Sequence, residues 1–403
     1  FFIILFLFTF STYIRRKFSD IQIEQKQIKI ESGNKKYKQN VSSRIVGIDI
    51  TKGFAAFLMI AAHCAGANTL LPFGNFGAAL FFFCSGMNTI LFLERTKKFK
   101  GVLFYQLFFV LLLFFGGYTQ IVIAHPDVKG FIPAFLQFNA LGILLIFTLF
   151  KICKYYRFVG YLFFLPFLFH FGYKLGLLPF INTNTNWTLF LFGKTGFPLF
   201  PWAGYLLYGV LVLYLHKKSK GLPVLLTITG ISSIFSILVL KIPVHRYNMS
   251  LSYILLGLFV LAFLFYIFNR VYLKVQSGFI MSIQDNIAMV GRNSLMFVYV
   301  HYCILRYLLP RVPDFSSFIE LLFQALIAFV FCIFFIFIYE KIKHDYSLFF
   351  PAIVITFFLF VSRYALLFAE DIELIIIDMI IGIIFAFLYV QLRGKFKVVL
   401  KKT

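Results

Sequence analysis

The sequence predicts an all-α membrane protein, a polytopic transmembrane helical bundle of about 12 helices preceded by a partial hydrophobic helix at the N-terminus. Hydrophobic residues make up 61% of the 403 residues and charged residues only 13%. A water-soluble domain of this size cannot bury so much apolar surface. The apolar runs reach about twenty residues, which is the length a helix needs to cross roughly 30 Å of hydrocarbon. They do not alternate with polar residues, which argues against a transmembrane β-barrel.

The first of these elements is the opening run, residues 1–14, which is short for a membrane span. We expect it to be the remnant of a first transmembrane helix. A polar, Lys-rich linker follows it. We therefore predict two parts: an N-terminal hydrophobic segment with a basic cytoplasmic linker at 1–43, and a transmembrane domain at 44–403.

The remaining spans follow as apolar segments separated by short polar loops. The segment 158–177 contains Pro166 and His170, so we expect it to be short or tilted. The twelve expected spans are 45–66, 73–93, 101–124, 131–150, 158–177, 196–215, 221–242, 249–268, 286–308, 318–339, 347–368 and 373–391.

The charges of the loops predict the orientation of these spans. Cytoplasmic loops of membrane proteins are enriched in Lys and Arg. With the linker inside, alternate loops carry 28 of the 38 Lys and Arg residues and the outer loops carry 6. One omitted or invented helix would invert every later loop and destroy this contrast. The loops predicted to be cytoplasmic are 15–44, 94–100, 151–157, 216–220, 269–285, 340–346 and the tail 392–403.

The net charge of +23 does not indicate a nucleic-acid partner. The basic residues lie in short loops between spans, and no separate basic domain could follow a phosphate backbone. The cysteines have no metal-ligand spacing, and we expect no metal site. They lie in or beside apolar segments, as packing residues do, at Cys64, Cys84, Cys153, Cys303 and Cys332.

The first span after the linker has the densest set of ionisable residues, which are costly inside a bilayer. It contains Arg44, Asp49, Lys52 and His63. Eleven residues separate Lys52 from His63, so both project from one helix face, about 16 Å apart along the axis. Asp49 precedes Lys52 by three residues and is placed to pair with it.

This spacing suits a donor with a phosphorylated head and a long arm. Lys52 and Arg44 could hold phosphates, while His63 takes a proton from an attacking hydroxyl or amine. The structural alternative is that both cations reach to the cytoplasmic interface, Asp49 only neutralises Lys52, and His63 is a packing or interfacial histidine.

Four stretches, in order along the chain, resemble the membrane acyltransferase superfamily. Its two relevant branches are the heparan-α-glucosaminide N-acetyltransferase-like proteins and the bacterial glycan O-acetyltransferases. The resemblance covers about residues 44–306 and leaves out 1–43. The stretches are Arg44 to His63; Phe81-Phe82-Phe83-Cys84-Ser85-Gly86; Gly196-Phe197-Pro198-Leu199-Phe200-Pro201-Trp202-Ala203-Gly204; and Gly291-Arg292-Asn293-Ser294-Leu295, followed by Tyr299 and His301.

The resemblance implies a cytosolic acyl-CoA donor, acetyl-CoA in most members, and a glycan or small-molecule acceptor on the far side of the membrane. Carried over by position, His63 becomes the catalytic base. Lys52 stands where glycan O-acetylating members usually have Arg, so the charge is kept and the planar two-pronged fit to phosphate is lost. Arg44 and Arg292 are the other candidate donor-binding residues, and a snorkelling anchor is the alternative for Arg292.

A second departure concerns the acceptor. The animal heparan enzyme has Asn at the position of His63, and its catalytic His lies in the following luminal loop. This chain has no His between residues 64 and 76. We therefore expect chemistry like that of the bacterial branch, and heparan itself is not implied.

Further polar and aromatic residues are candidates for substrate contact or support. Ser294 and His301 lie seven residues apart on nearly one helix face, and His301 could orient the substrate or His63, or only satisfy a structural hydrogen bond. Trp202 could stack on a sugar or adenine, although Trp near an interface is usually an anchor. Ser85, in the Phe-rich stretch, completes the candidates.

Two other functions fit the same spans. A transporter or flippase could use the intramembrane charges for ion coupling, but no repeat relates the two halves of the chain. A structural subunit could keep the fold without catalysis, which the Lys at position 52 leaves open.

Overall fold

The described part of the molecule is helical. The computed structural model describes residues 45–65, 72–96, 102–124, 135–177, 191–192, 198–218, 221–244, 249–274, 278–305, 317–343, 352 and 372–402. No strand occurs among them. The contacts divide the chain after Arg44, and the fold below belongs to the unit Ile45–Thr403. The predictions for residues 1–43, for Arg44 and for the span 347–368, apart from residue 352, lie outside the described residues.

The helices follow the predicted spans in order. They are α2 (Val46–Ala65), η1 (Pro72–Phe76), α3 (Gly77–Thr96), α4 (Val102–Ala124), α5 (Phe135–Cys153), α6 (Tyr156–Tyr161), α7 (Phe164–Lys174), α9 (Leu199–Lys217), α10 (Gly221–Ile234), η2 (Phe235–Val239), α11 (Leu251–Lys274), α12 (Gly278–Arg292), α13 (Ser294–Cys303), α14 (Phe318–Ile342) and α16 (Ile372–Lys402).

Seven of the described helices are long and apolar enough to cross a membrane, namely α2, α3, α5, α9, the α10–η2 pair, α11 and α14. Several of them also expose large apolar side chains along their length, as lipid-facing helices do. Val330 on α14, for example, is 63% exposed, and Ile231 on α10 is equally exposed at 63%. The all-helical prediction is therefore confirmed for the described residues, and their apolar helices fit a multi-pass membrane protein, while the number of spans and the additional N-terminal helix stay predictions.

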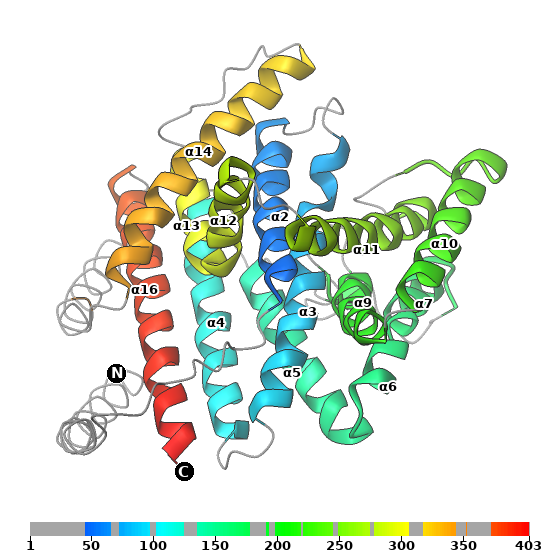
Figure 1. The fold of residues 1–403 in the computed structure, drawn as a ribbon, viewed down its shortest axis with the longest axis horizontal. Helices are drawn as coiled ribbons and strands as arrows, with labels where there is room; N and C mark the ends of the chain where they lie inside the picture. The colour runs from blue at the N-terminus through cyan, green and yellow to red at the C-terminus, as the bar shows by residue number, and fades with distance from the viewer. Residues whose placement is uncertain are drawn as a thin grey trace. The chain divides into compact units, whose positions relative to one another are not determined.

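The helices that carry the candidate residues pack on one another. In Figure 1, α2, α3, α4 and α5 run side by side, with α16 next to α4 and α9 next to α3. The α3–α9 crossing is close because two glycines face the partner backbone. A Cβ added at Gly86 would lie 1.9 Å from the carbonyl oxygen of Leu206, and one at Gly209 would lie 2.0 Å from that of Phe83. Small residues at such crossings let apolar helices approach without a clash.

Two contacts between helices that are distant in the sequence join helix ends that the predicted topology places on the same side of the membrane. At one side, Lys217 of α9 forms a 2.7 Å ion pair with Glu94 of α3. At the other, the hydroxyl of Tyr253, near the start of α11, donates to the carbonyl of Asn75 in η1 over 2.8 Å. Each pair matches the predicted up-and-down order of the spans. Which end faces the cytoplasm stays a prediction.

Two predicted spans are broken. The segment 158–177 forms α6 and α7, separated at Leu162 and Phe163, and Pro166 lies in the first turn of α7, where its missing N–H costs no helical hydrogen bond. The segment 286–308 changes direction at Asn293, whose backbone (φ −105°, ψ 32°) is not helical. Hydrophobic runs reveal neither break, because both sides of each break are apolar.

Two predicted cytoplasmic loops are largely helical. Residues 269–285 contain the end of α11, which runs to Lys274, and the start of α12 at Gly278. The first turns of α12 expose both Phe279 and Asp285, a pattern typical of an amphipathic helix at an interface. The tail 392–403 continues α16 as far as Lys402. These segments are helical because low hydropathy argues against a membrane span but does not exclude a helix, and their cytoplasmic location stays a prediction.

Candidate functional site

His63 lies near the C-terminal end of α2 and contacts two rings of α13. Its ring centroid is 5.5 Å from that of His301 and 5.2 Å from that of Tyr302. The rings of His301 and Tyr302 are themselves 4.2 Å apart. His63 is partly exposed, whereas His301 is fully buried. The structure thus brings together two histidines that lie 238 positions apart in the sequence.

The hydrogen bond of His301 fixes its tautomer. Nδ1 of His301 lies 2.9 Å from the carbonyl oxygen of Phe297, which can only accept, so Nδ1 carries the proton in the neutral ring. The ring stacks on Phe297 with centroids 4.7 Å apart. Nε2 is then a lone-pair acceptor, and this buried atom has no hydrogen-bond partner among the described residues. A donor brought into this space would satisfy it.

Helix α13 is bonded to α4 close to His301. The hydroxyl of Tyr299 donates to the carbonyl of Gly116 in α4 over 2.8 Å, and Ile304, beyond His301, is buried. Since Tyr299 precedes His301 by two residues, this bond between helices limits rotation of α13 and keeps the His301 ring directed at α2.

Lys52 lies on α2 toward the opposite end from His63 and projects toward α3. Its ammonium is 5.8 Å from the centre of the Phe81 ring, a cation–π distance. The charges of Lys52 and the buried Asp49 both act on the thiol of Cys84 in α3. Lys52 therefore faces the protein interior rather than lipid. The predicted pairing of Asp49 with Lys52 stays a prediction.

A row of rings connects the surroundings of Lys52 with those of His63. Phe81, beside Lys52, stacks on Phe297 with centroids 6.0 Å apart, and Phe297 stacks on His301. Both Phe rings are buried. Lys52 and His63 therefore contact one aromatic interior, as the spacing along the helix predicts. A ligand arm that reaches from Lys52 to His63 therefore has to run alongside these rings or displace them.

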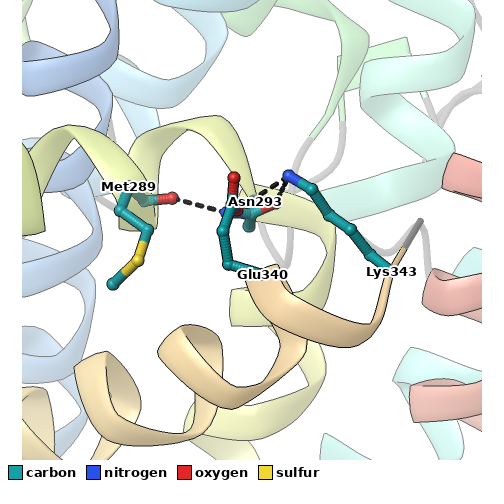
Figure 2. A network of polar contacts seen from close by, with 4 residues as sticks. All are labelled: Met289, Asn293, Glu340 and Lys343. Carbon is teal, nitrogen blue, oxygen red and sulfur yellow. Dashed lines mark hydrogen bonds and ion pairs between the residues drawn. The ribbon is translucent and has the colours of Figure 1, made fainter. Parts of the chain in front are cut away.

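The α12–α13 break is stabilised by a polar network from the end of α14, shown in Figure 2. The amide nitrogen of Asn293 donates to the carbonyl of Met289 over 2.9 Å and to the carboxylate of Glu340. Lys343 donates to the amide oxygen of Asn293 over 3.1 Å and pairs with Glu340 at 2.7 Å. Every polar atom of the Asn293 side chain is thereby bonded.

Sequence reasoning missed Glu340 and Lys343, which it assigned to the edge of a loop. A signal was available, because the two are three residues apart at the end of a span, the spacing of an ion pair on a helix. Arg292, a predicted donor-binding residue, is exposed next to this network and acts electrostatically on Glu340.

Helix α12 crosses α2 at the turn that contains Asp49 and Lys52. A Cβ added at Gly291 would lie 1.9 Å from the carbonyl oxygen of Asp49, and one at Gly53 would lie 1.9 Å from that of Ile287. Glycine at both positions lets the two backbones touch. This crossing places Arg292 within one residue of the contact with the Asp49–Gly53 turn.

The remaining predicted residues lie in the same bundle and pack against other parts of it. Trp202 on α9 is 3% exposed and packs edge-on against Phe82 of α3, so the structure gives it a core-packing position. Ser85 is buried on α3, and its carbonyl accepts from the hydroxyl of Thr89. Ser294 begins α13 and is partly buried. Their predicted contacts with substrate stay predictions.

Within the described residues, no group of three or more His, Cys, Asp or Glu residues could hold a metal ion. Comparison of the chain with protein-family models and with curated proteins found no match.

Proposed function

We propose that this protein is an integral membrane acyltransferase that moves an acyl group, acetyl in the simplest case, from cytosolic acyl-CoA to a glycan or related acceptor on the opposite side. The observation that carries the proposal is the relation of Lys52 to His63. One helix presents a cation and an imidazole to one aromatic interior, and the imidazole contacts a second, buried histidine. The four stretches that resemble membrane acyltransferases support it, since the helices that hold them pack against one another.

The reaction assigns His63 the role of general base. An acceptor hydroxyl gives its proton to the His63 imidazole as its oxygen attacks the thioester carbonyl. The new C–O bond forms as the C–S bond breaks. CoA leaves as a thiolate, and the proton of the acceptor hydroxyl stays on His63. Nε2 of His301 is an acceptor that can orient either the acceptor hydroxyl or the N–H of His63. Lys52 holds the phosphates of the donor as a point charge, and Arg292 binds them through its planar guanidinium group.

A transporter is the second candidate, and the broken α12–α13 pair favours it. Discontinuous helices with charged residues at the break are typical of substrate and ion sites in secondary transporters. Asn293, Glu340 and Lys343 form such a set. In this alternative the ion pair opens during transport and CoA is not consumed.

One experiment separates the two functions. The full chain is reconstituted in proteoliposomes with radiolabelled acetyl-CoA and a panel of glycan acceptors, and release of CoA is measured with and without acceptor. Acyl transfer predicts acceptor-dependent CoA release that is lost in His63→Gln and kept in His216→Gln. His216 is a matched control, because it is a partly buried histidine at the end of α9, beside Asn269 and away from His63. Transport of label without CoA release would support the alternative.

A further inference from the structure

The side chain of Arg393, on α16, contacts residues of α3 and α4 and takes no part in the site around Lys52 and His63. Its guanidinium carbon, on α16, is 5.7 Å from the centre of the Phe92 ring on α3. The same side chain interacts with the hydroxyls of Tyr105 on α4 and Tyr389 on α16. The ring and both tyrosines are buried. The guanidinium therefore lies against buried aromatic side chains; Arg393 as a whole is partly exposed, while its Nε atom is buried.

No described residue supplies a negative charge to Arg393. No carboxylate among the described residues interacts with Arg393, and its Nε atom is buried without a hydrogen-bond partner in that part of the chain. A charge removed from water and left without a counter-ion is costly, so buried cations are normally paired. The tyrosine hydroxyls and the Phe92 ring offer dipoles and a quadrupole but no negative charge.

The groups gathered here are suited to an anion with several oxygens. A guanidinium has five N–H donors and no acceptor. The hydroxyls of Tyr105 and Tyr389, which interact with Arg393, each carry a proton that they can donate. The guanidinium and the hydroxyl protons of Tyr105 and Tyr389 therefore converge as donors, and the planar fork of Arg matches two phosphate oxygens at once.

The position along α3 relates this space to the candidate active site. Phe92 lies two residues from Glu94, at the end of α3 that the loop charges assign to the cytoplasm. The other end of α3 begins at Gly77, which packs against Met59, one turn from His63. Fifteen residues of helix between Gly77 and Phe92 place the Arg393 space about 22 Å from the His63 end.

We propose that Arg393, Tyr105 and Tyr389 form a binding site for a phosphate group at the ends of α3, α4 and α16. The phosphate can belong to the headgroup of an anionic phospholipid or to the nucleotide of the acyl donor, and only the second source rests on the proposed function. The helix ends supply the enclosure, Arg393 the charge and the two tyrosines the remaining donors.

The test uses the full chain in nanodiscs and follows its thermal unfolding midpoint. In the first arm, discs of phosphatidylcholine are titrated with adenosine 3′,5′-bisphosphate, which is the nucleotide part of CoA. In the second arm, no nucleotide is added and the discs contain increasing fractions of phosphatidic acid. The variants are Arg393→Gln and, as a matched control, Arg270→Gln, which removes an exposed arginine that also lies over an aromatic ring, that of Tyr266. We expect the wild type and the control to be stabilised by one of the two probes. We expect Arg393→Gln to need at least about tenfold more of it.

The outcomes separate the two sources. A response to the nucleotide identifies the donor as the ligand, and a response to phosphatidic acid alone identifies the lipid and leaves the site standing even if acyl transfer is disproved. No stabilisation of the wild type by either probe, or an unchanged response in Arg393→Gln, would overturn the site. If Arg393→Gln does not fold, the double variant Tyr105→Phe, Tyr389→Phe tests the phosphate site instead, since it removes two hydrogen-bond donors and no charge. A weaker response supports the site and an unchanged one overturns it.

Discussion

The ring centroids of His63 and His301 lie 5.5 Å apart. His301 is the fully buried ring of the two, and its Nε2 has no hydrogen-bond partner among the described residues. His301 is held by its own hydrogen bond to Phe297 and by α13, so its orientation does not depend on His63. A rigid histidine beside a partly exposed one is the arrangement expected of a positioning residue and a proton-transferring residue.

Replacing His301 therefore tests a positioning role. We expect His301→Gln to lower kcat on the order of 100-fold through misplacement of the reacting groups, with little change in KM for acyl-CoA. The pH profile of kcat should shift, because His63 loses the neighbour that orients it. A purely structural role of His301 predicts instead a lower unfolding temperature with an unchanged pH profile of the folded fraction.

Lys52 should act on the donor. We expect Lys52→Met to raise KM for acyl-CoA about tenfold, a loss of roughly 1.4 kcal/mol of binding, with kcat largely retained. Lys52→Arg should keep or improve KM, because Arg adds the planar fit to phosphate. Equal loss in both variants would show that Lys52 serves packing over Phe81 rather than charge. The measurement is steady-state kinetics at two salt concentrations, with the difference between Lys52→Met and wild type shrinking at high salt.

The glycine crossing of α2 and α12 should be sensitive to a single methyl group. Gly291→Ala is expected to destabilise the fold by about 1–3 kcal/mol, because its Cβ would meet the backbone of Asp49, which cannot move aside. Gly230→Ala is the control, since its Cβ meets only the side chain of Phe259. Thermal unfolding in detergent compares the two, and an equal midpoint in both variants would contradict the close crossing.

The network at Asn293 predicts a non-additive pair of substitutions. Lys343→Met leaves the carboxylate of Glu340 without its ion pair and should destabilise by about 1–3 kcal/mol, less than a fully buried pair because Glu340 is partly exposed. Adding Glu340→Gln should restore part of the loss, giving a coupling of about 0.5–3 kcal/mol in a double-mutant cycle. Additive effects would mean that the two side chains do not interact in the membrane.

Much of the fold could be predicted because a bilayer restricts which sequences can form a membrane span. A span must be an apolar run long enough to cross the membrane and a loop must not, so α2, α3, α5, α9 and α11 follow directly from hydropathy. The break at Asn293 could not be predicted in this way. It depends on side chains of α14, 47 and 50 residues away, that bond the Asn293 amide.

The candidate site was predicted only along one helix. Helical geometry places Lys52 and His63 on one face of α2 from spacing alone, and both do contact the same aromatic interior. The pairing of His63 with His301, and the row of Phe rings between His63 and Lys52, depend on how α3 and α13 pack against α2. No local pattern encodes that packing.

Transfer of label across the membrane tests the central relation between Lys52 and His63 most directly. Acetyl-CoA labelled in the acetyl group is supplied on one face of sealed proteoliposomes and the glycan acceptor only on the other. The wild type is expected to label the acceptor across the bilayer, and His63→Gln to do so roughly 100- to 10,000-fold more slowly at an unchanged KM for acetyl-CoA. Full-rate labelling by His63→Gln would contradict His63 as the base.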